Sequence, residues 1–162
     1  MNRWYTGSGL RTLNGDPLPA ELLDDRAVLF VNVASQCGHT PQYAGLQQLW
    51  QAWRDRGLTV VGVPCNQFGA QEPGGPEEIS AFCSRTYQVD FPLLEKQDVN
   101  GPNRSALYQH LVDSAVGAGV DIRWNFEKFL VNRQGEVTWR GRSSVKPDDD
   151  ALRDAIASVL GL

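Results

Sequence analysis

The stretch from Val28 to Pro41, VLFVNVASQCGHTP, decides the fold. It begins with an apolar run rich in β-branched residues and continues into small and polar residues. A buried strand that leads through a turn into a helix is typical of α/β proteins. Cys37 would lie in that turn, at or near the N-terminus of the next helix, where free N–H groups and the helix dipole favour an anion. We therefore expect Cys37 to react as a thiolate, the nucleophilic form of cysteine.

The length and composition indicate an ordinary globular protein. The chain has 162 residues, of which 41% are hydrophobic and 21% charged, and its formal charge is −4. One domain over residues 1–162 can hold its own core, and the acidic balance argues against a nucleic-acid partner. No apolar run approaches the roughly 20 residues of a membrane helix, and the first ten residues lack the apolar core of a signal peptide. We therefore expect a cytoplasmic protein without a membrane anchor.

The cysteine count fits this location. Three cysteines, at positions 37, 65 and 83, are too few for the disulfide framework of a secreted protein, and their number is odd. At least one of them is more suited to chemistry than to cross-linking. Together with the two histidines they show no metal-ligand spacing, so we expect neither a metal site nor a bound cofactor.

The order of predicted elements indicates a thioredoxin-like α/β fold. A central mixed sheet would have helices on both faces, and an N-terminal β-hairpin around Asn14-Gly15 would precede it. Polar loops follow the two buried strands at the sheet edge where α/β proteins bind ligands. The predicted strands are 27–33, 58–63, 128–131 and 136–140, and the predicted helices are 43–56, 76–87, 105–112 and 148–160, with a single helical turn in 19–25.

Three sequence blocks carry a family resemblance. They read VNVASQCG (31–38), PCNQFGAQEP (64–73) and WNFEKFLVNRQGEV (124–137). In this order they resemble the signature blocks of the glutathione peroxidase family, and the similarity extends over about residues 10–158. The resemblance implies a thioredoxin fold, an antioxidant role in the response to oxidative stress, and reduction of hydroperoxides by a cysteine or selenocysteine.

The resemblance also implies which residues act. Cys37 would be the peroxidatic nucleophile, and Gln71, Trp124 and Asn125 would complete a catalytic tetrad. A thiolate that attacks an O–O bond needs hydrogen-bond donors around the sulfur and a proton for the leaving oxygen. Two amides and an indole supply neutral donors, and attack leaves Cys37 as a sulfenic acid. Each residue alone is more typical of core packing or loop hydrogen bonding, so only the joint pattern supports the assignment.

A fourth block concerns the next step of the reaction. FCSRTYQVDFP (82–92) resembles the resolving-cysteine block of the thioredoxin-dependent branch of the family, with Gln88 where glycine is common. Cys83 would then form a disulfide with Cys37; the alternative is a cysteine on a helix face without a redox role. A disulfide needs Cα atoms within about 7 Å, and we expect a larger separation in the reduced fold. Residues 83–89 would therefore have to unwind before the bond can form.

The reductant is predicted from two departures from the glutathione-using tetrameric relatives. Those relatives carry an arginine five positions after the nucleophile, where this chain has Gln42, and they have an insertion before Trp124 that this chain lacks. Both differences favour thioredoxin over glutathione, and a monomer or weak dimer. Phe68 and Trp124 could form an apolar surface for a protein reductant. His39 is interpreted as a surface residue that modulates access, with a catalytic-base role as the alternative.

Other functions remain open at this point. The same residues could serve a peroxide sensor that relays oxidation to a partner protein. A thioredoxin-type disulfide oxidoreductase would need Cys-x-x-Cys, but Thr40 occupies the last position. Cys65 is interpreted as structural, and Asn66 and Gln67 as residues that hold their loop through side-chain to backbone bonds. A shallow site without a lid should accept both hydrogen peroxide and organic hydroperoxides.

Overall fold

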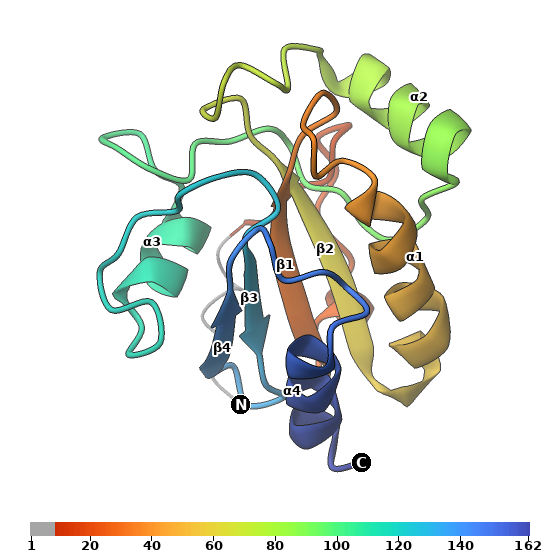
Figure 1. Ribbon diagram of the computed structural model, residues 1–162, viewed down its shortest axis with the longest axis vertical. Coiled ribbons are helices and arrows are strands. Elements are labelled where there is room, and N and C mark those ends of the chain that lie inside the picture. Colours follow the sequence, from red (N-terminus) through yellow and green to blue (C-terminus); the bar gives the residue numbers. More distant parts are fainter. Residues whose placement is uncertain (1–8) are drawn as a thin grey trace.

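A computed structural model describes residues 9–162 of the chain (Figure 1). The helices and strands follow one another in the order predicted from the sequence. They are η1 (Ala20–Leu22), β1 (Ala27–Val33), α1 (Gln42–Trp53), η2 (Arg54–Arg56), β2 (Leu58–Pro64), α2 (Pro76–Tyr87), α3 (Ala106–Asp113), β3 (Lys128–Val131), β4 (Val137–Gly141) and α4 (Asp150–Leu160).

The sheet has four strands in the order β2-β1-β3-β4. β1 and β2 are parallel, with Ala27 opposite Leu58, whereas β3 runs antiparallel to both β1 and β4. This confirms the predicted mixed sheet. Every residue of β1 and β2 is buried, as expected for central strands covered on both faces.

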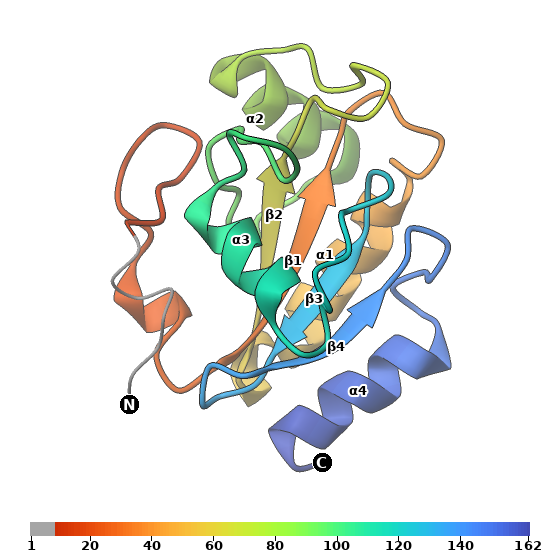
Figure 2. The same cartoon turned by 90° about the vertical axis from the view of Figure 1, so that its left-hand side faces the viewer.

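Helices cover both faces of the sheet, as predicted (Figures 1 and 2). Leu29 and Val31 point toward the core shared with α1, α2 and α4, and Val28 and Phe30 toward the core shared with α3. This alternation follows from the two-residue period of a strand. α2 lies beyond the ends of β1 and β2 at which their arrowheads point (Figure 2). The loops that follow both strands therefore meet α2 at one edge of the molecule.

The predicted N-terminal hairpin is present but very short. Arg11 pairs with Pro17 through an isolated antiparallel bridge, and the N–H of Thr12 donates to the carbonyl of Asp16 at 2.8 Å. Gly15 adopts φ +89°, as the Asn-Gly turn requires. The pairing ends early because proline has no N–H to donate, and Pro17 and Pro19 both lie in the return segment.

Element boundaries match closely elsewhere. α2 spans the predicted residues, and the predicted helix 43–56 is divided into α1 and η2 before Gly57 ends it in the left-handed conformation at φ +107°. α4 begins two residues later than predicted, at Asp150. Within residues 9–162, no helix combines the length and the apolar character that crossing a bilayer requires.

Candidate active site

Cys37 lies in a tight turn between β1 and α1. The hydroxyl of Thr40 accepts the N–H of Cys37 at 2.9 Å and donates to the carbonyl of Ala34 at 2.8 Å. The N–H of Thr40 in turn donates to the carbonyl of Cys37 at 3.0 Å. Cys37 is only 8% exposed. The turn therefore holds the sulfur in a fixed place with a small opening to solvent.

The sulfur receives a hydrogen bond from the turn itself. The backbone N–H of His39 lies 3.3 Å from Sγ of Cys37. Because α1 begins at Gln42, Cys37 precedes the helix by five residues, and the donor that reaches the sulfur belongs to the turn rather than to the first turn of the helix. A backbone donor can stabilise a thiolate and carries no titrating charge. The His39 ring has a different neighbour, with Nδ1 3.5 Å from Nε2 of Gln42.

The loop that carries Gln71 lies against the residues just before Cys37. The N–H of Gln36 donates to the carbonyl of Gln71 at 3.0 Å. Ser35 donates to Oε1 of Glu72 from its N–H at 3.1 Å and from its hydroxyl at 2.5 Å. Two consecutive residues before Cys37 are thus bonded to two consecutive residues of the second sequence block, which places Gln71 beside the cysteine turn.

Gln71, Trp124 and Asn125 are brought together. Nδ2 of the buried Asn125 donates to Oε1 of Gln71 at 3.0 Å, so the Gln71 amide keeps Nε2 as its donor end. The Trp124 ring packs against Phe68, with 5.8 Å between the ring centroids. Trp124 is 38% exposed whereas Phe68 is buried, so the surface expected from both rings is contributed mainly by Trp124. The cluster is joined to Cys37 through the bond between Gln36 and Gln71.

The turn at residues 124–126 is held by hydrogen bonds to Asn32 of β1 and Lys128 of β3. Nδ2 of Asn32 donates to the carbonyl of Trp124 at 3.0 Å, and the carbonyl of Asn32 accepts the N–H of Phe126 at 2.6 Å. Phe126 adopts φ +64°, a left-handed conformation that a bulky residue rarely takes. Its carbonyl accepts a bond of 2.7 Å from the buried ammonium of Lys128, and burial lowers the pKa of that group to about 8.

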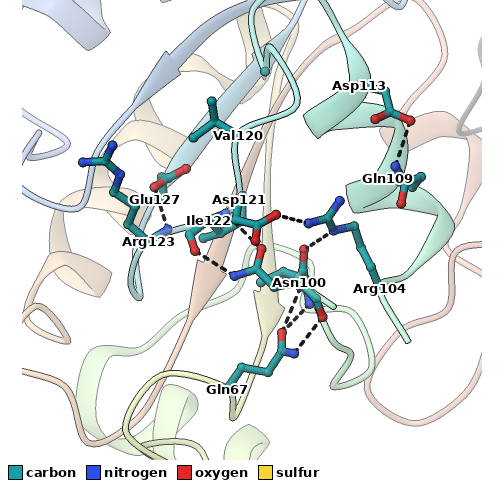
Figure 3. Close-up of polar contacts among 12 residues, drawn as sticks. Gln67, Asn100, Arg104, Gln109, Asp113, Val120, Asp121, Ile122, Arg123 and Glu127 are labelled. Carbon is teal, nitrogen blue, oxygen red and sulfur yellow. Dashed lines mark hydrogen bonds and ion pairs between the residues drawn. The ribbon is translucent and has the colours of Figure 1, made fainter. Parts of the chain in front are cut away.

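A network of hydrogen bonds holds the chain segment that precedes Trp124 (Figure 3). Oε1 of Gln67 accepts the N–H groups of Val99 and Asn100 at 2.7 and 3.0 Å. The Asn100 side chain then pairs with both backbone groups of Ile122, at 2.7 and 2.9 Å. Nearby, Oδ1 of Asn66 accepts the N–H of Glu72 at 2.9 Å. These bonds confirm the prediction that Asn66 and Gln67 hold their loop through side-chain to backbone bonds.

A buried ion pair completes the support of this loop. Glu127, which is 1% exposed, lies 2.5 Å from the Arg140 guanidinium. It also accepts the N–H of Arg123 at 3.2 Å (Figure 3). The same guanidinium donates to the carbonyls of Gly117 and Val120 at 3.0 and 2.9 Å. One arginine on β4 thus holds residues 117–121, which lead into Trp124.

Sequence reasoning missed two residues of the site. Thr40 was considered only as a missing cysteine, yet it holds the Cys37 turn. Glu72 is buried, and burial raises the pKa of its carboxyl, opposed by the hydrogen bonds from Ser35 and by the charge of Lys96. A Glu at this position looks like any loop residue in the sequence. Only its position against Ser35 in the fold reveals its role.

Cys83 lies in the middle of α2, deep in the core. It is 1% exposed, and burial raises the pKa of its thiol to about 11, with a smaller opposing effect of the Tyr43 hydroxyl. Cys37 and Cys83 belong to the same hydrophobic cluster, and both are free thiols. In this position Cys83 is a poor nucleophile, because the thiolate is the reactive form.

Cys65 has the environment of a structural residue. Cys65 directly follows β2 and is 1% exposed, and its Sγ lies 3.4 Å from Oε1 of Gln67. Burial raises the pKa of its thiol. These features agree with the structural interpretation of this cysteine.

Comparisons with known proteins agree with the sequence blocks. The family model described as glutathione peroxidase matches residues 6–112. A hydroperoxy fatty acid reductase of Synechocystis is 59% identical over 154 residues, covering 95% of this chain and 97% of the relative. A glutathione peroxidase-like peroxiredoxin of Schizosaccharomyces pombe is 51% identical, covering 91% and 92%. A thioredoxin/glutathione peroxidase of Escherichia coli is 40% identical, covering 93% and 94%.

Solved structures give the same fold. The crystal structure of Trgpx in its apo form has a TM-score of 0.74 and 32% identity, and the match covers 94% of this chain and 92% of that one. A thioredoxin family protein from Chlorobium tepidum reaches a TM-score of 0.66 at 18% identity, covering 93% and 91%, which is a likeness of fold alone. The predicted thioredoxin-like fold is thereby confirmed.

Proposed function

The chain belongs to the glutathione peroxidase family and is a hydroperoxide-reducing oxidoreductase, and we propose that Cys37 is its nucleophile. The observation that carries the assignment is the cysteine turn. Its backbone N–H donates to the sulfur, and it is bonded to the loop that presents Gln71. Asn125 and Trp124 lie against that loop, through the bond to Gln71 and the packing on Phe68, and we propose them as further donors.

The first step reduces the peroxide. The Cys37 thiolate attacks one oxygen of the O–O bond, so an S–O bond forms while the O–O bond breaks. The sulfur is oxidised to a sulfenic acid, and the leaving oxygen takes a proton and departs as an alcohol or water. Neutral N–H groups of Gln71, Trp124 and Asn125 stabilise the negative charge that develops on that oxygen, as in an oxyanion hole.

The second step regenerates the thiol. Cys83 attacks the sulfur of Cys37, an S–S bond forms, the S–O bond breaks, and the oxygen leaves as water. Exchange with the dithiol of a thioredoxin then returns both cysteines to the reduced state and oxidises the thioredoxin. For this step Cys83 must first become accessible, because it is buried in α2.

Thioredoxin is the proposed reductant in preference to glutathione. Gln42, at the position where glutathione-using relatives carry an arginine, is buried, and its Nε2 donates to the carbonyl of Ser143 at 2.7 Å. The side chain thus offers no charge to a glutathione carboxylate. The partly exposed Trp124 suits contact with a protein partner, and we propose that the chain acts as a monomer or weak dimer in the cytoplasm.

The proposed substrates are hydrogen peroxide and organic hydroperoxides, including hydroperoxy fatty acids. The name of the Synechocystis relative supports the last class. The chemistry requires only the O–O bond to reach Cys37.

A coupled assay tests this function. With thioredoxin, thioredoxin reductase and NADPH, we expect steady turnover of peroxide, little turnover with glutathione, and none in Cys37→Ser. Cys65→Ser is the matched control and should keep most of the activity. Turnover with glutathione alone would contradict the proposed reductant, and activity of Cys37→Ser would contradict the proposed nucleophile.

The burial of Cys83 favours one alternative. A slowly resolved sulfenic acid persists long enough to pass its oxidation to a partner protein, as a peroxide sensor does. Fast oxidation of Cys37 combined with slow turnover in the thioredoxin assay would favour the sensor over the peroxidase.

A further inference from the structure

The resolving step, which belongs to the proposed function, requires Cys83 to leave a packed position. Its helix is held to α1 by an aromatic cluster in which the Tyr43 ring lies 6.4 Å from Phe82 and 5.6 Å from Tyr87, centroid to centroid. The thiol itself is 1% exposed. The rate at which Cys83 meets the oxidised Cys37 therefore depends on how firmly the end of α2 is held.

The end of α2 is weak by its own chemistry. Gln88 ends the helix in the left-handed conformation at φ +54°, which is unfavourable for a residue other than glycine. The closing bonds are from Gln88 N–H to the carbonyl of Ser84 and from Val89 N–H to the carbonyl of Cys83, both at 3.1 Å. The Gln88 N–H also donates to the carbonyl of Cys83, so the bonds that close α2 come from the two residues that follow it.

Asp90, which follows Val89, is held by the side chain of Gln47 in α1. Nε2 of Gln47 donates to Oδ1 of Asp90 at 2.6 Å, and Oε1 of Gln47 accepts the N–H of Asp90 at 3.0 Å. Gln47 is 6% exposed, so both bonds start from a fixed side chain. Arg54 adds only an exposed ion pair with Asp90, at 3.9 Å, and such pairs contribute little.

We propose that Gln47 is a positioning residue of the resolving step, whose paired amide keeps Asp90 in place and so controls how often Cys83 is released toward Cys37. The outer side of the segment offers room for this movement. A hollow of about 690 Å³ is lined by Cys83, Val89 and Asp90 among others. Release also exposes the thiol to water, which raises the share of the reactive thiolate above that in the buried state.

The test separates the two chemical steps. The full-length reduced protein is mixed with one equivalent of hydrogen peroxide and quenched at intervals with an alkylating agent, and mass spectrometry counts oxidised Cys37 and the Cys37–Cys83 disulfide. Loss of the two hydrogen bonds in Gln47→Ala should speed disulfide formation about tenfold and leave oxidation of Cys37 unchanged. Hydrogen exchange of the amides of residues 84–90 should accelerate with it.

Two further variants make the result specific. Gln48→Ala alters the neighbouring exposed glutamine of α1 and should leave both rates unchanged. Asp90→Ala removes one of the two bonds from the solvent-exposed side without touching the core, and should give an intermediate acceleration. This variant keeps the test informative if Gln47→Ala does not fold.

Two outcomes would overturn the proposal, and they differ in what they say about the function. If residues 84–90 exchange faster while disulfide formation is unchanged or slower, Gln47 does not control the step. If the unaltered protein oxidises Cys37 but never forms a Cys37–Cys83 disulfide, the resolving role of Cys83 is wrong and this proposal falls with it. The peroxidase function of Cys37 would survive either result.

Discussion

At the residue scale, Asn125 connects the parts of the site. It is fully buried and donates to Oε1 of Gln71, while its neighbour Trp124 packs on Phe68 in the same loop. Its bond fixes the Gln71 amide with Nε2 as the donor end, and a donor fixed in this way needs no reorganisation when charge develops on the leaving oxygen. Its contribution should therefore appear in the peroxide step.

We expect Asn125→Ala to slow oxidation of Cys37 by about 100-fold, because Gln71 loses the bond that orients its amide and the site then loses one fixed donor. The second-order rate with hydrogen peroxide, measured by stopped-flow fluorescence, checks this. Asn103→Ala, at an exposed position, is the control and should react like the unaltered protein. A change of less than threefold in Asn125→Ala would show that Asn125 does not act on this step.

The thiol of Cys83 gives a pH dependence. Burial raises its pKa to about 11, against the smaller effect of the Tyr43 hydroxyl, and the nearby Glu72 charge raises it further. The released thiol that reacts ionises more readily than the buried one, and below its pKa the thiolate fraction still grows about tenfold for each pH unit. Disulfide formation after a peroxide pulse should therefore accelerate steadily from pH 6 to pH 8, as followed by quenched mass spectrometry. A rate that is flat over this range would mean that release, not ionisation, limits the step.

At the scale of an element, the turn between β1 and α1 depends on one hydroxyl. Thr40 bonds both the N–H of Cys37 and the carbonyl of Ala34. A valine has the same shape without the hydroxyl and leaves two buried backbone groups unpaired. We therefore expect loss of this hydroxyl to affect both the stability of the turn and the reactivity of Cys37.

Thr40→Val should lower the free energy of unfolding by about 1–3 kcal/mol and slow the oxidation of Cys37. Urea denaturation and the peroxide rate are the two measurements. Thr40→Ser keeps the hydroxyl and should restore most of both quantities. If Thr40→Val retained the stability and rate of the unaltered protein, the hydroxyl would not be what holds the turn.

The elements could be predicted well where local chemistry sets them. β1 and α2 match their predicted ranges because an apolar run and an N-terminal proline define them. The candidate tetrad followed from sequence blocks and family resemblance, and within it the structure bonds Asn125 to Gln71. Thr40, Glu72 and Gln47 could not be found in this way, because their importance lies in contacts between segments that are distant in the sequence or folded into one turn.

For the whole molecule, Arg140 links the sheet to the site. From β4 it pairs with the buried Glu127 and holds the carbonyls of Gly117 and Val120. The loop before Trp124 therefore takes its shape from a strand at the edge of the sheet. Breaking a buried ion pair from one side leaves an unpaired charge, which is costly.

Arg140→Ala should destabilise the protein by about 3–5 kcal/mol, because Glu127 stays buried without its partner. Thermal and urea denaturation measure the loss. Arg142→Ala, an exposed arginine one residue beyond β4, should cost less than about 0.5 kcal/mol. Adding Glu127→Gln to Arg140→Ala should recover part of the stability; no recovery would mean that packing, not charge, accounts for the loss.

The most direct test of the central claim is to find which sulfur reacts first. Reduced Cys83→Ser protein receives one equivalent of hydrogen peroxide in the presence of dimedone, which traps sulfenic acids, and peptide mass spectrometry locates the label. We predict that the label falls on Cys37 and that it forms far faster than on free cysteine. A label on Cys65, or a Cys37 no more reactive than free cysteine, would contradict the account.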